Sequence, residues 1–146
     1  MVESSMSDFT IIIDTREQRP LFFRDVETIR RALKTGDYSI EGCEDRVSIE
    51  RKSLEDLLSC VTSRREAFND QMTRLLSFES KALLIEARPL DLEQGNWFPK
   101  VHPNAVIGTV LKWKMKGIPV IYANGQEQAA KYVAWFMRLF WERKYE

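Results

Sequence analysis

The feature of this chain that most restricts its fold is the segment "KALLIEA", from Lys81 to Ala87, where apolar residues follow one another without alternation. A run of this kind is typical of a strand that is buried on both faces of a sheet. The segment "FTIIID", from Phe9 to Asp14, is a second short apolar run, and it ends in a charged residue. Both segments predict buried strands, and a sheet buried on both faces requires helices on each side.

The segments around these runs have strand and helix patterns in turn. We predict further strands at 37–42, 45–52 and 118–123, and helices at 53–61, 62–76, 103–116 and 126–143. Residues 26–33 fit a strand or a short helix, and we expect a loop with Gly95 before the 103–116 helix. This order predicts an α/β fold with a mixed central β-sheet flanked by α-helices, and a right-handed crossover in its later strand–helix–strand step.

Length and composition indicate one domain, which we place at 9–146 after a flexible tail at 1–8. The 146 residues are 44% hydrophobic and 30% charged, which is ordinary for a single globular domain. No apolar run has the length of a membrane span, no secretion signal is present, and Cys43 and Cys60 lack metal-ligand spacing, so we expect a cytoplasmic protein with free thiols. The net charge of zero argues against strong non-specific nucleic-acid binding, although a local basic patch remains compatible with it.

The segment "VSIERKSLEDLL", from 47 to 58, places charged residues at the end of a predicted strand. Because alternate strand residues share a face, Glu50 and Lys52 point the same way and Arg51 points the other way. A carboxylate can bind a hard divalent cation, which lowers the pKa of a bound water, and a neighbouring ammonium can position that water or stabilise phosphate charge. This pattern suits phosphodiester hydrolysis.

A metal site of this kind needs a second carboxylate. Asp37, at the start of a predicted strand, is the first candidate, and Asp14, with Glu17 behind it, is the next. The spacing alone also fits a simple edge-strand salt bridge of Glu50, with Asp56 as an acid that favours the start of a helix.

Three motifs together resemble the XPF family of structure-specific DNA endonucleases. They are "DTRE" (14–17), "GDY" (36–38) and "IERKSLED" (49–56), and the family is marked by G-D followed by E-R-K-x-x-x-D. The segments "SRREAFNDQMTRL" and "IPVIYANGQEQAAKYV" extend the resemblance over residues 9–137. "DTREQRP" and "HPNAV" look most like the small stand-alone members of bacteria and phages.

The resemblance implies a restriction-endonuclease-like core that hydrolyses DNA phosphodiester bonds near junctions or flaps in branched DNA, with Mg²⁺ or Mn²⁺ as cofactor. Its motif positions give the candidate catalytic residues Asp14, Glu17, Asp37, Glu50, Arg51 and Lys52. Asp37, Glu50 and Asp14 correspond to metal ligands. Lys52 corresponds to the catalytic base or a water-positioning residue. Repair, recombination and phage DNA processing are all compatible with this activity.

Two motif positions have supporting roles. We assign Arg51 to structural pairing, with Asp56 as one candidate partner, or to a DNA contact at the strand end. Asp56 itself supports the site. The alternative function is a non-catalytic DNA-binding or scaffolding module on the same fold, which the presence of all the acidic positions argues against. The chain has neither the helix-hairpin-helix tail nor the helicase domain of larger members, which leaves a partner protein as a source of extra DNA grip.

Basic residues near the motifs are candidates for DNA contact. We assign this role to Arg16, Arg64 and Arg65, and favour Arg65 as the arginine of the family helix. The three lysines around Trp113 fit either a surface for single-stranded DNA or a solvated helix end. Trp97 and Phe98 fit packing over the sheet or a wedge at a DNA junction.

The predicted C-terminal helix is apolar over more of its circumference than one core requires. A large exposed apolar patch usually marks a partner site, and nuclease domains of the XPF family pair. We therefore expect a homodimer through this helix, with the interface candidates Trp135, Phe136, Leu139 and Phe140.

Overall fold

The computed structural model describes residues 8–97 and 101–143, and the first seven residues of the predicted tail lie outside this range. In chain order its elements are β1 (Thr10–Ile13), β2 (Glu27–Arg30), β3 (Tyr38–Ile40), β4 (Val47–Ser53), α1 (Leu54–Cys60), α2 (Arg65–Leu75), β5 (Ser80–Glu86), α3 (Pro89–Gln94), α4 (Pro103–Lys116), β6 (Val120–Tyr122) and α5 (Gln126–Glu142). All the predicted strands and helices are present. The open assignment of residues 26–33 resolves as a strand, β2.

The strands of the described chain form one mixed sheet in the order β2-β1-β3-β4-β5-β6. β1 pairs parallel to β2 and antiparallel to β3, and β3 pairs antiparallel to β4. From there on, β4, β5 and β6 run parallel, so their carboxyl ends meet at one edge of the sheet. The predicted mixed sheet is confirmed.

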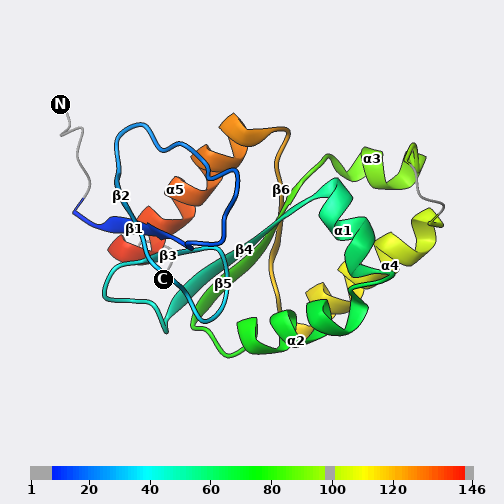
Figure 1. The fold of residues 1–146 in the computed structure, drawn as a ribbon, viewed down its shortest axis with the longest axis horizontal. Coiled ribbons are helices and arrows are strands. Elements are labelled where there is room, and N and C mark those ends of the chain that lie inside the picture. Colours follow the sequence, from blue (N-terminus) through cyan, green and yellow to red (C-terminus); the bar gives the residue numbers. More distant parts are fainter. Residues whose placement is uncertain (1–7, 98–100, 144–146) are drawn as a thin grey trace.

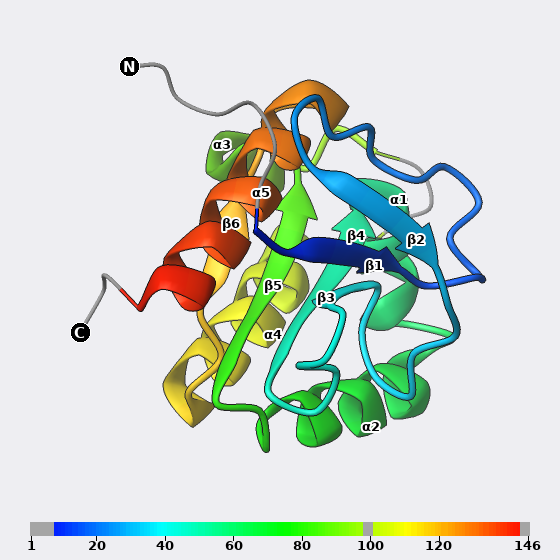
Figure 2. The same ribbon diagram turned by 90° about the vertical axis from the view of Figure 1, so that its left-hand side faces the viewer.

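Helices cover both faces of this sheet. Figures 1 and 2 show α5 across one face, with α1, α2 and α4 on the other. Within β5, Ala82 and Leu84 pack into the core beneath α5, whereas Leu83 and Ile85 pack against α1, α2 and α4. All four side chains are fully buried, which confirms the prediction for "KALLIEA". The flanked sheet confirms the predicted α/β class.

The helix ends follow local sequence signals. Ser53 Oγ accepts a hydrogen bond from the Asp56 N–H at the start of α1, and His102 caps α4 in the same way. Gly117 ends α4 in a left-handed conformation, as predicted. The short helix α3, where we expected only a loop, was missed. It begins at Pro89, a typical first-turn residue, and Gly95 in a left-handed conformation follows its last residue, Gln94. No helix in the described ranges is long and apolar enough to cross a bilayer.

Candidate active site

Asp37, Glu50 and Lys52 form one cluster, here called the carboxylate–lysine cluster. Asp37 directly precedes β3, while Glu50 and Lys52 lie on the neighbouring strand β4. The Lys52 Nζ atom is 3.4 Å from a carboxylate oxygen of Glu50, which agrees with the shared face predicted from strand alternation. The carboxyl groups of Asp37 and Glu50 are close enough to share a hydrogen bond.

The backbone fixes the position of Asp37. Its N–H donates to the Ile49 carbonyl at 2.8 Å, and its carboxylate accepts from the Arg51 N–H at 2.8 Å. The preceding Gly36 has a φ of +86°, and a Cβ atom there would lie 1.9 Å from the Ser48 hydroxyl oxygen. Only glycine fits at this position, which explains the glycine of the "GDY" motif.

The two carboxyl groups of the cluster resist ionisation together. Burial, followed by the negative charges of Glu50 and Glu17, raises the pKa of Asp37 to about 8. Burial also raises the pKa of Glu50, although Lys52 and the hydrogen bond with Asp37 act in the opposite direction. Two buried carboxyl groups in contact therefore hold a proton at neutral pH unless a further positive charge compensates them.

Lys52 supplies part of that compensating charge. Burial alone lowers the pKa of its ammonium group, but the charge of Glu50 and smaller contributions from Cys60 and Asp37 raise it above the usual lysine value. The Nζ atom also lies 5.9 Å from the centre of the Phe68 ring on α2. Lys52 is therefore a fixed cation beside the two carboxyl groups.

Arg51 has different partners from Glu50 and Lys52, as expected for a residue on the other face of the strand. Its Nε donates to Glu86 at the end of β5, and its Nη1 donates to Glu17 at 3.0 Å and to the Arg19 carbonyl at 2.6 Å. Burial alone lowers the pKa of Arg51, but the hydrogen bond to Glu86 and further contacts raise it. Glu17 and Glu86, and not Asp56, are the ion-pair partners that the structure gives Arg51.

Arg51, Glu17, Glu86 and the Arg19 carbonyl form a set of contacts that we call the arginine network. Tyr38 holds Glu17 in this network. The Tyr38 hydroxyl donates to the Glu17 carboxylate at 2.8 Å and accepts from the Leu21 N–H at 2.9 Å. The Oε2 atom of Glu17 accepts both the hydrogen bond from Tyr38 and the hydrogen bond from Arg51. Its charge still contributes to the raised pKa of Asp37, so Glu17 lies near the carboxylate–lysine cluster.

Asp14 directly follows β1 and is tied to the same region by its backbone, since its N–H donates to the Asp37 carbonyl at 2.9 Å. Its buried carboxylate accepts from the Leu33 N–H at 2.8 Å and from Arg16 Nε at 2.8 Å. Burial opposes the charge, but the Arg16 and Leu33 hydrogen bonds lower the pKa of Asp14. Both carboxylate oxygens of Asp14 thus have protein partners, and the lowered pKa favours its ionised form. The role of Asp14 as a metal ligand stays a prediction.

The donor set of the cluster fits a hard divalent cation. Within residues 8–97 and 101–143, no three His, Cys, Asp or Glu side chains form a preformed metal cage. Asp37 and Glu50 supply two carboxylates, and Mg²⁺ is commonly bound through one or two carboxylates together with waters and substrate phosphates. A cation here would also offset the charge that keeps these two groups protonated.

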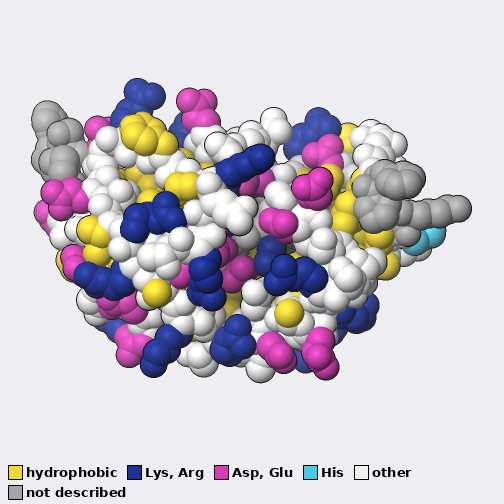
Figure 3. Space-filling model, viewed as in Figure 1, with side chains coloured by type: hydrophobic (Ala, Val, Ile, Leu, Met, Phe, Trp, Pro, Cys, Tyr) yellow, Lys and Arg dark blue, Asp and Glu magenta, His cyan; other side chains and the backbone are white. Residues whose placement is uncertain are grey.

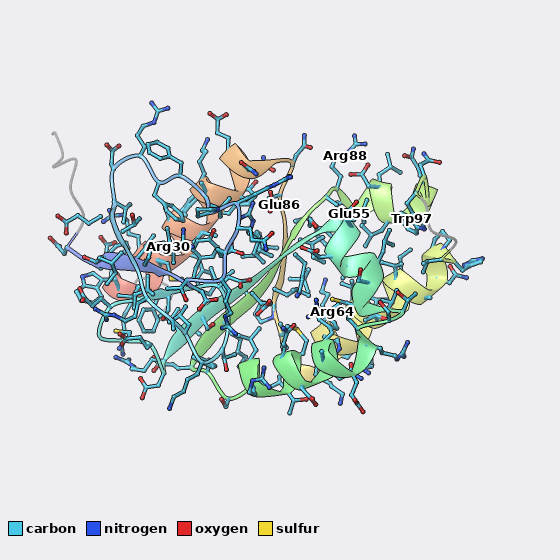
Figure 4. The ribbon with its side chains drawn as sticks, viewed as in Figure 1. Arg30, Glu55, Arg64, Glu86, Arg88 and Trp97 are labelled. Atoms are coloured by element: carbon cyan, nitrogen blue, oxygen red, sulfur yellow. The ribbon has the colours of Figure 1, made fainter. Side chains whose placement is uncertain are left out.

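The predicted DNA-contact arginines are all exposed, and Arg16 is the one whose charge is tied to the cluster among the contacts that the structure gives them. Arg16 is largely exposed, and its charge interacts with Asp37 and Glu50. Arg64 and Arg65 are exposed at the start of α2, where Arg64 has no side-chain cap contact (Figure 4). In Figure 3, basic and acidic side chains gather around the middle of the same face.

Other aromatic candidates have structural roles. Trp113 is buried between Lys112 and Lys116, whose Nζ atoms lie 5.1 and 5.0 Å from its ring, so it offers no open face for a base. Trp97 packs against the core beneath α4, and its Nε1 donates to the Val101 carbonyl at 2.9 Å. Phe98 lies outside the described residues.

Sequence reasoning missed Tyr38 and Glu86. Glu86 ends β5 and pairs in register with Ser53, so the meeting of parallel strand ends at one edge could have identified it (Figure 4). Tyr38 follows Asp37 directly, but nothing in the sequence indicated that its hydroxyl would reach the loop between β1 and β2.

The fold and the cluster define a class: α/β proteins with a mixed six-stranded sheet flanked by helices and with acidic and basic side chains at a strand end. The family model described as the ERCC4 domain matches residues 13–136, so the chain belongs to the ERCC4 domain family. The resemblance to XPF seen in the sequence motifs is thereby confirmed.

Solved structures agree with this fold. XPF from Aeropyrum pernix has a TM-score of 0.72 and 20% sequence identity, covering 89% of this chain and 60% of that chain. The same protein in complex with DNA has a TM-score of 0.70 and 19% identity, covering 94% of this chain and 68% of that chain.

A curated relative extends the comparison by sequence. A protein described as an ATP-dependent RNA helicase of Methanocaldococcus jannaschii is 30% identical over 123 residues. The match covers 82% of this chain but only 14% of the relative. The chain thus spans a small part of that protein and about 60% of the first XPF structure.

Proposed function

We propose that this protein is a divalent-metal-dependent DNA endonuclease that hydrolyses phosphodiester bonds near junctions or flaps in branched DNA. The observation that carries the proposal is the carboxylate–lysine cluster, in which the Asp37 carboxylate accepts from the Arg51 N–H on the strand that carries Glu50, and Lys52 Nζ lies 3.4 Å from Glu50. Membership of the ERCC4 domain family and the XPF fold support it. Such cuts serve DNA repair and recombination, and we place the activity in the cytoplasm of a bacterial or phage-infected cell.

The chain's own residues have distinct roles in this reaction. Asp37 and Glu50 would hold Mg²⁺ or Mn²⁺, which when bound provides Lewis-acid stabilisation of the phosphate and a more acidic water. Lys52 keeps its proton because its pKa is raised, so we assign it to stabilising negative charge at the phosphate and positioning the attacking water. Arg51 holds the ends of β4 and β5 and the loop after β1 in register.

DNA is the partner that best fits the surroundings of the cluster. Arg16, Arg64 and Arg65 are exposed, and the charge of Arg16 interacts with Asp37 and Glu50, so we assign these arginines to phosphate contacts that do not read bases. The XPF of Aeropyrum pernix, which shares this fold, has been determined in complex with DNA. Because the net charge is zero, DNA binding by this chain depends on local contacts. We propose that a partner protein supplies additional contacts to the DNA.

A homodimer through α5 is part of the proposal. Trp135 is 63% exposed, and the neighbouring Phe136 and Leu139 line two apolar hollows of about 250 and 240 Å³. Phe140 lines the first hollow but is itself almost fully buried in the core. One continuous apolar face of this kind fits a second copy of the same helix.

Cleavage of a labelled flap substrate tests the proposed activity. Wild-type protein should cut in Mg²⁺ or Mn²⁺ and lose the activity in EDTA. Glu50→Gln, which keeps the shape of the side chain, should reduce the rate by about 10²-fold or more. The matched control is Glu55→Gln, a similar change on the exposed face of α1.

The outcomes separate enzyme from scaffold. Cutting that survives Glu50→Gln would place the activity elsewhere or in a contaminant. DNA binding by the wild-type protein without cleavage in either metal would support the alternative of a non-catalytic DNA-binding or scaffolding module on the same fold.

A further inference from the structure

Phe22 projects from the loop between β1 and β2. Its side chain is 81% exposed, while the residues on either side, Leu21 and Phe23, are only 3% and 7% exposed. Both neighbours belong to the core beneath α5. The backbone is therefore anchored on each side of the one aromatic ring that it presents to solvent.

Several contacts hold this loop in one conformation. The Tyr38 hydroxyl accepts the Leu21 N–H at 2.9 Å, and the Tyr38 ring packs edge-on against Phe23 at 5.8 Å. Arg30 donates to the Glu17 carbonyl at 2.8 Å from the opposite side of the loop. A loop fixed in this way presents its exposed ring with little further loss of conformational entropy on binding.

The loop between β1 and β2, residues 14–26, carries three exposed arginines, namely Arg16, Arg19 and Arg24. It also carries three acids: Asp14 is paired with Arg16, Glu17 is paired with Arg51, and Asp25 is exposed. The charged side chains of the loop other than these pairs are therefore two arginines, Arg19 and Arg24, and one acid. Figure 3 shows hydrophobic atoms next to both basic and acidic side chains over this part of the molecule. A single aromatic ring among arginines matches the composition of surfaces that bind unpaired nucleotides.

The loop is also tied to the carboxylate–lysine cluster. The N–H of Leu21 reaches Tyr38, whose hydroxyl reaches Glu17, and Glu17 pairs with Arg51. The Arg51 backbone N–H in turn donates to the Asp37 carboxylate. Hydrogen bonds and an ion pair thus connect the loop to the strand that carries Glu50 and Lys52 and to Asp37.

We propose that Phe22 stacks on an unpaired base of the DNA substrate next to the carboxylate–lysine cluster, while the loop arginines contact the adjoining phosphates. This inference rests on the proposed nuclease function and names the part of the substrate that the site recognises. A protein partner fits less well, because the loop carries three exposed arginines and, apart from Phe22, no exposed large hydrophobic side chain. The preference for branched DNA then follows from a ring that needs a base free of its partner strand.

The test uses a flap oligonucleotide with 2-aminopurine at the unpaired position beside the branch, in Ca²⁺ to limit cleavage. Wild-type protein should quench the fluorescence on binding. Phe22→Ala should remove the quenching and weaken binding about tenfold, and Phe22→Leu should behave like Phe22→Ala because it keeps apolar bulk without a ring. Phe22→Trp should restore both signals.

The control is Met115→Ala on α4, a side chain that is 88% exposed and belongs to the helical layer on the other face of the sheet. It should leave quenching and affinity unchanged. If Phe22→Ala and Phe22→Leu bind and quench like wild type, the inference is overturned while the nuclease proposal stands. A changed sedimentation coefficient with unchanged DNA binding would assign the ring to protein contact and overturn it too. If the wild-type protein binds no DNA of any form, the proposed function fails and the inference fails with it.

Discussion

The carboxylate of Asp37 accepts a hydrogen bond from the backbone N–H of Arg51 at 2.8 Å. This bond ties an acid that precedes β3 to the strand that carries Glu50 and Lys52. The side chain of Arg51 then continues to Glu86 on β5 and to the loop after β1. One residue thus joins the carboxylate–lysine cluster to the arginine network, and the two can be tested separately.

The raised pKa of Asp37 predicts a pH dependence of stability for the metal-free protein. An acid whose pKa rises from 3.8 in the unfolded chain to about 8 in the fold stabilises the fold fully below pH 3.8 and loses that contribution as the pH rises through 8. In EDTA, the melting temperature should therefore fall between about pH 4 and pH 8, the window that these two pKa values define. Scanning calorimetry checks this, and Asp37→Asn should flatten the profile.

Added Mg²⁺ or Mn²⁺ should reverse the trend, because a bound cation favours the ionised carboxylates and displaces the shared proton. Proton release on metal addition, measured in a weakly buffered solution at neutral pH, gives an independent readout. A melting temperature that is insensitive to both pH and metal would contradict the proposed metal site.

Removing Arg51 should destabilise the fold strongly, because it leaves two largely buried carboxylates without their arginine partner. We expect Arg51→Met to lower the free energy of unfolding by about 3–5 kcal/mol, the usual range for one member of a buried ion pair. Urea unfolding measures this cost. Adding Glu86→Gln to Arg51→Met should recover part of the loss, whereas a purely additive double variant would show that the two side chains are not coupled.

Lys52 should affect the chemical step more than DNA binding. Lys52→Met removes a buried cation beside Glu50, and we expect the cleavage rate to fall by about 10²–10³-fold while the affinity for a flap substrate changes little. Single-turnover kinetics and fluorescence anisotropy separate the two quantities. The matched control is Lys81→Met, since Lys81 contacts only the Phe78 carbonyl among the hydrogen bonds that the structure gives its side chain. Equal losses of rate and affinity in Lys52→Met would assign the residue to DNA binding.

Much of this architecture was predictable, because local and periodic signals determine it. The uninterrupted run at 81–87 predicted the doubly buried strand, and strand alternation placed Glu50 beside Lys52. The sequence did not predict the arginine network, because a strand period tells which face Arg51 occupies but not which loop carbonyl or distant carboxylate it meets there. Such contacts depend on tertiary packing. The short α3 was missed for a related reason, since six residues are too few for a helical period to emerge.

The apolar face of α5 predicts that the protein is a dimer in solution. Phe136 lines both apolar hollows on this face, so Phe136→Glu would place a charge in the middle of the proposed contact. Sedimentation velocity at micromolar concentration should show a dimer for wild type and a monomer for Phe136→Glu. Because Phe136 also packs partly against the core, the milder Trp135→Ala should weaken the dimer without altering the melting temperature of the monomer. The control is Met115→Glu, which places a charge on an exposed position of α4 and should leave the dimer intact. A wild-type protein that sediments as a monomer would contradict the prediction that α5 is a self-association surface.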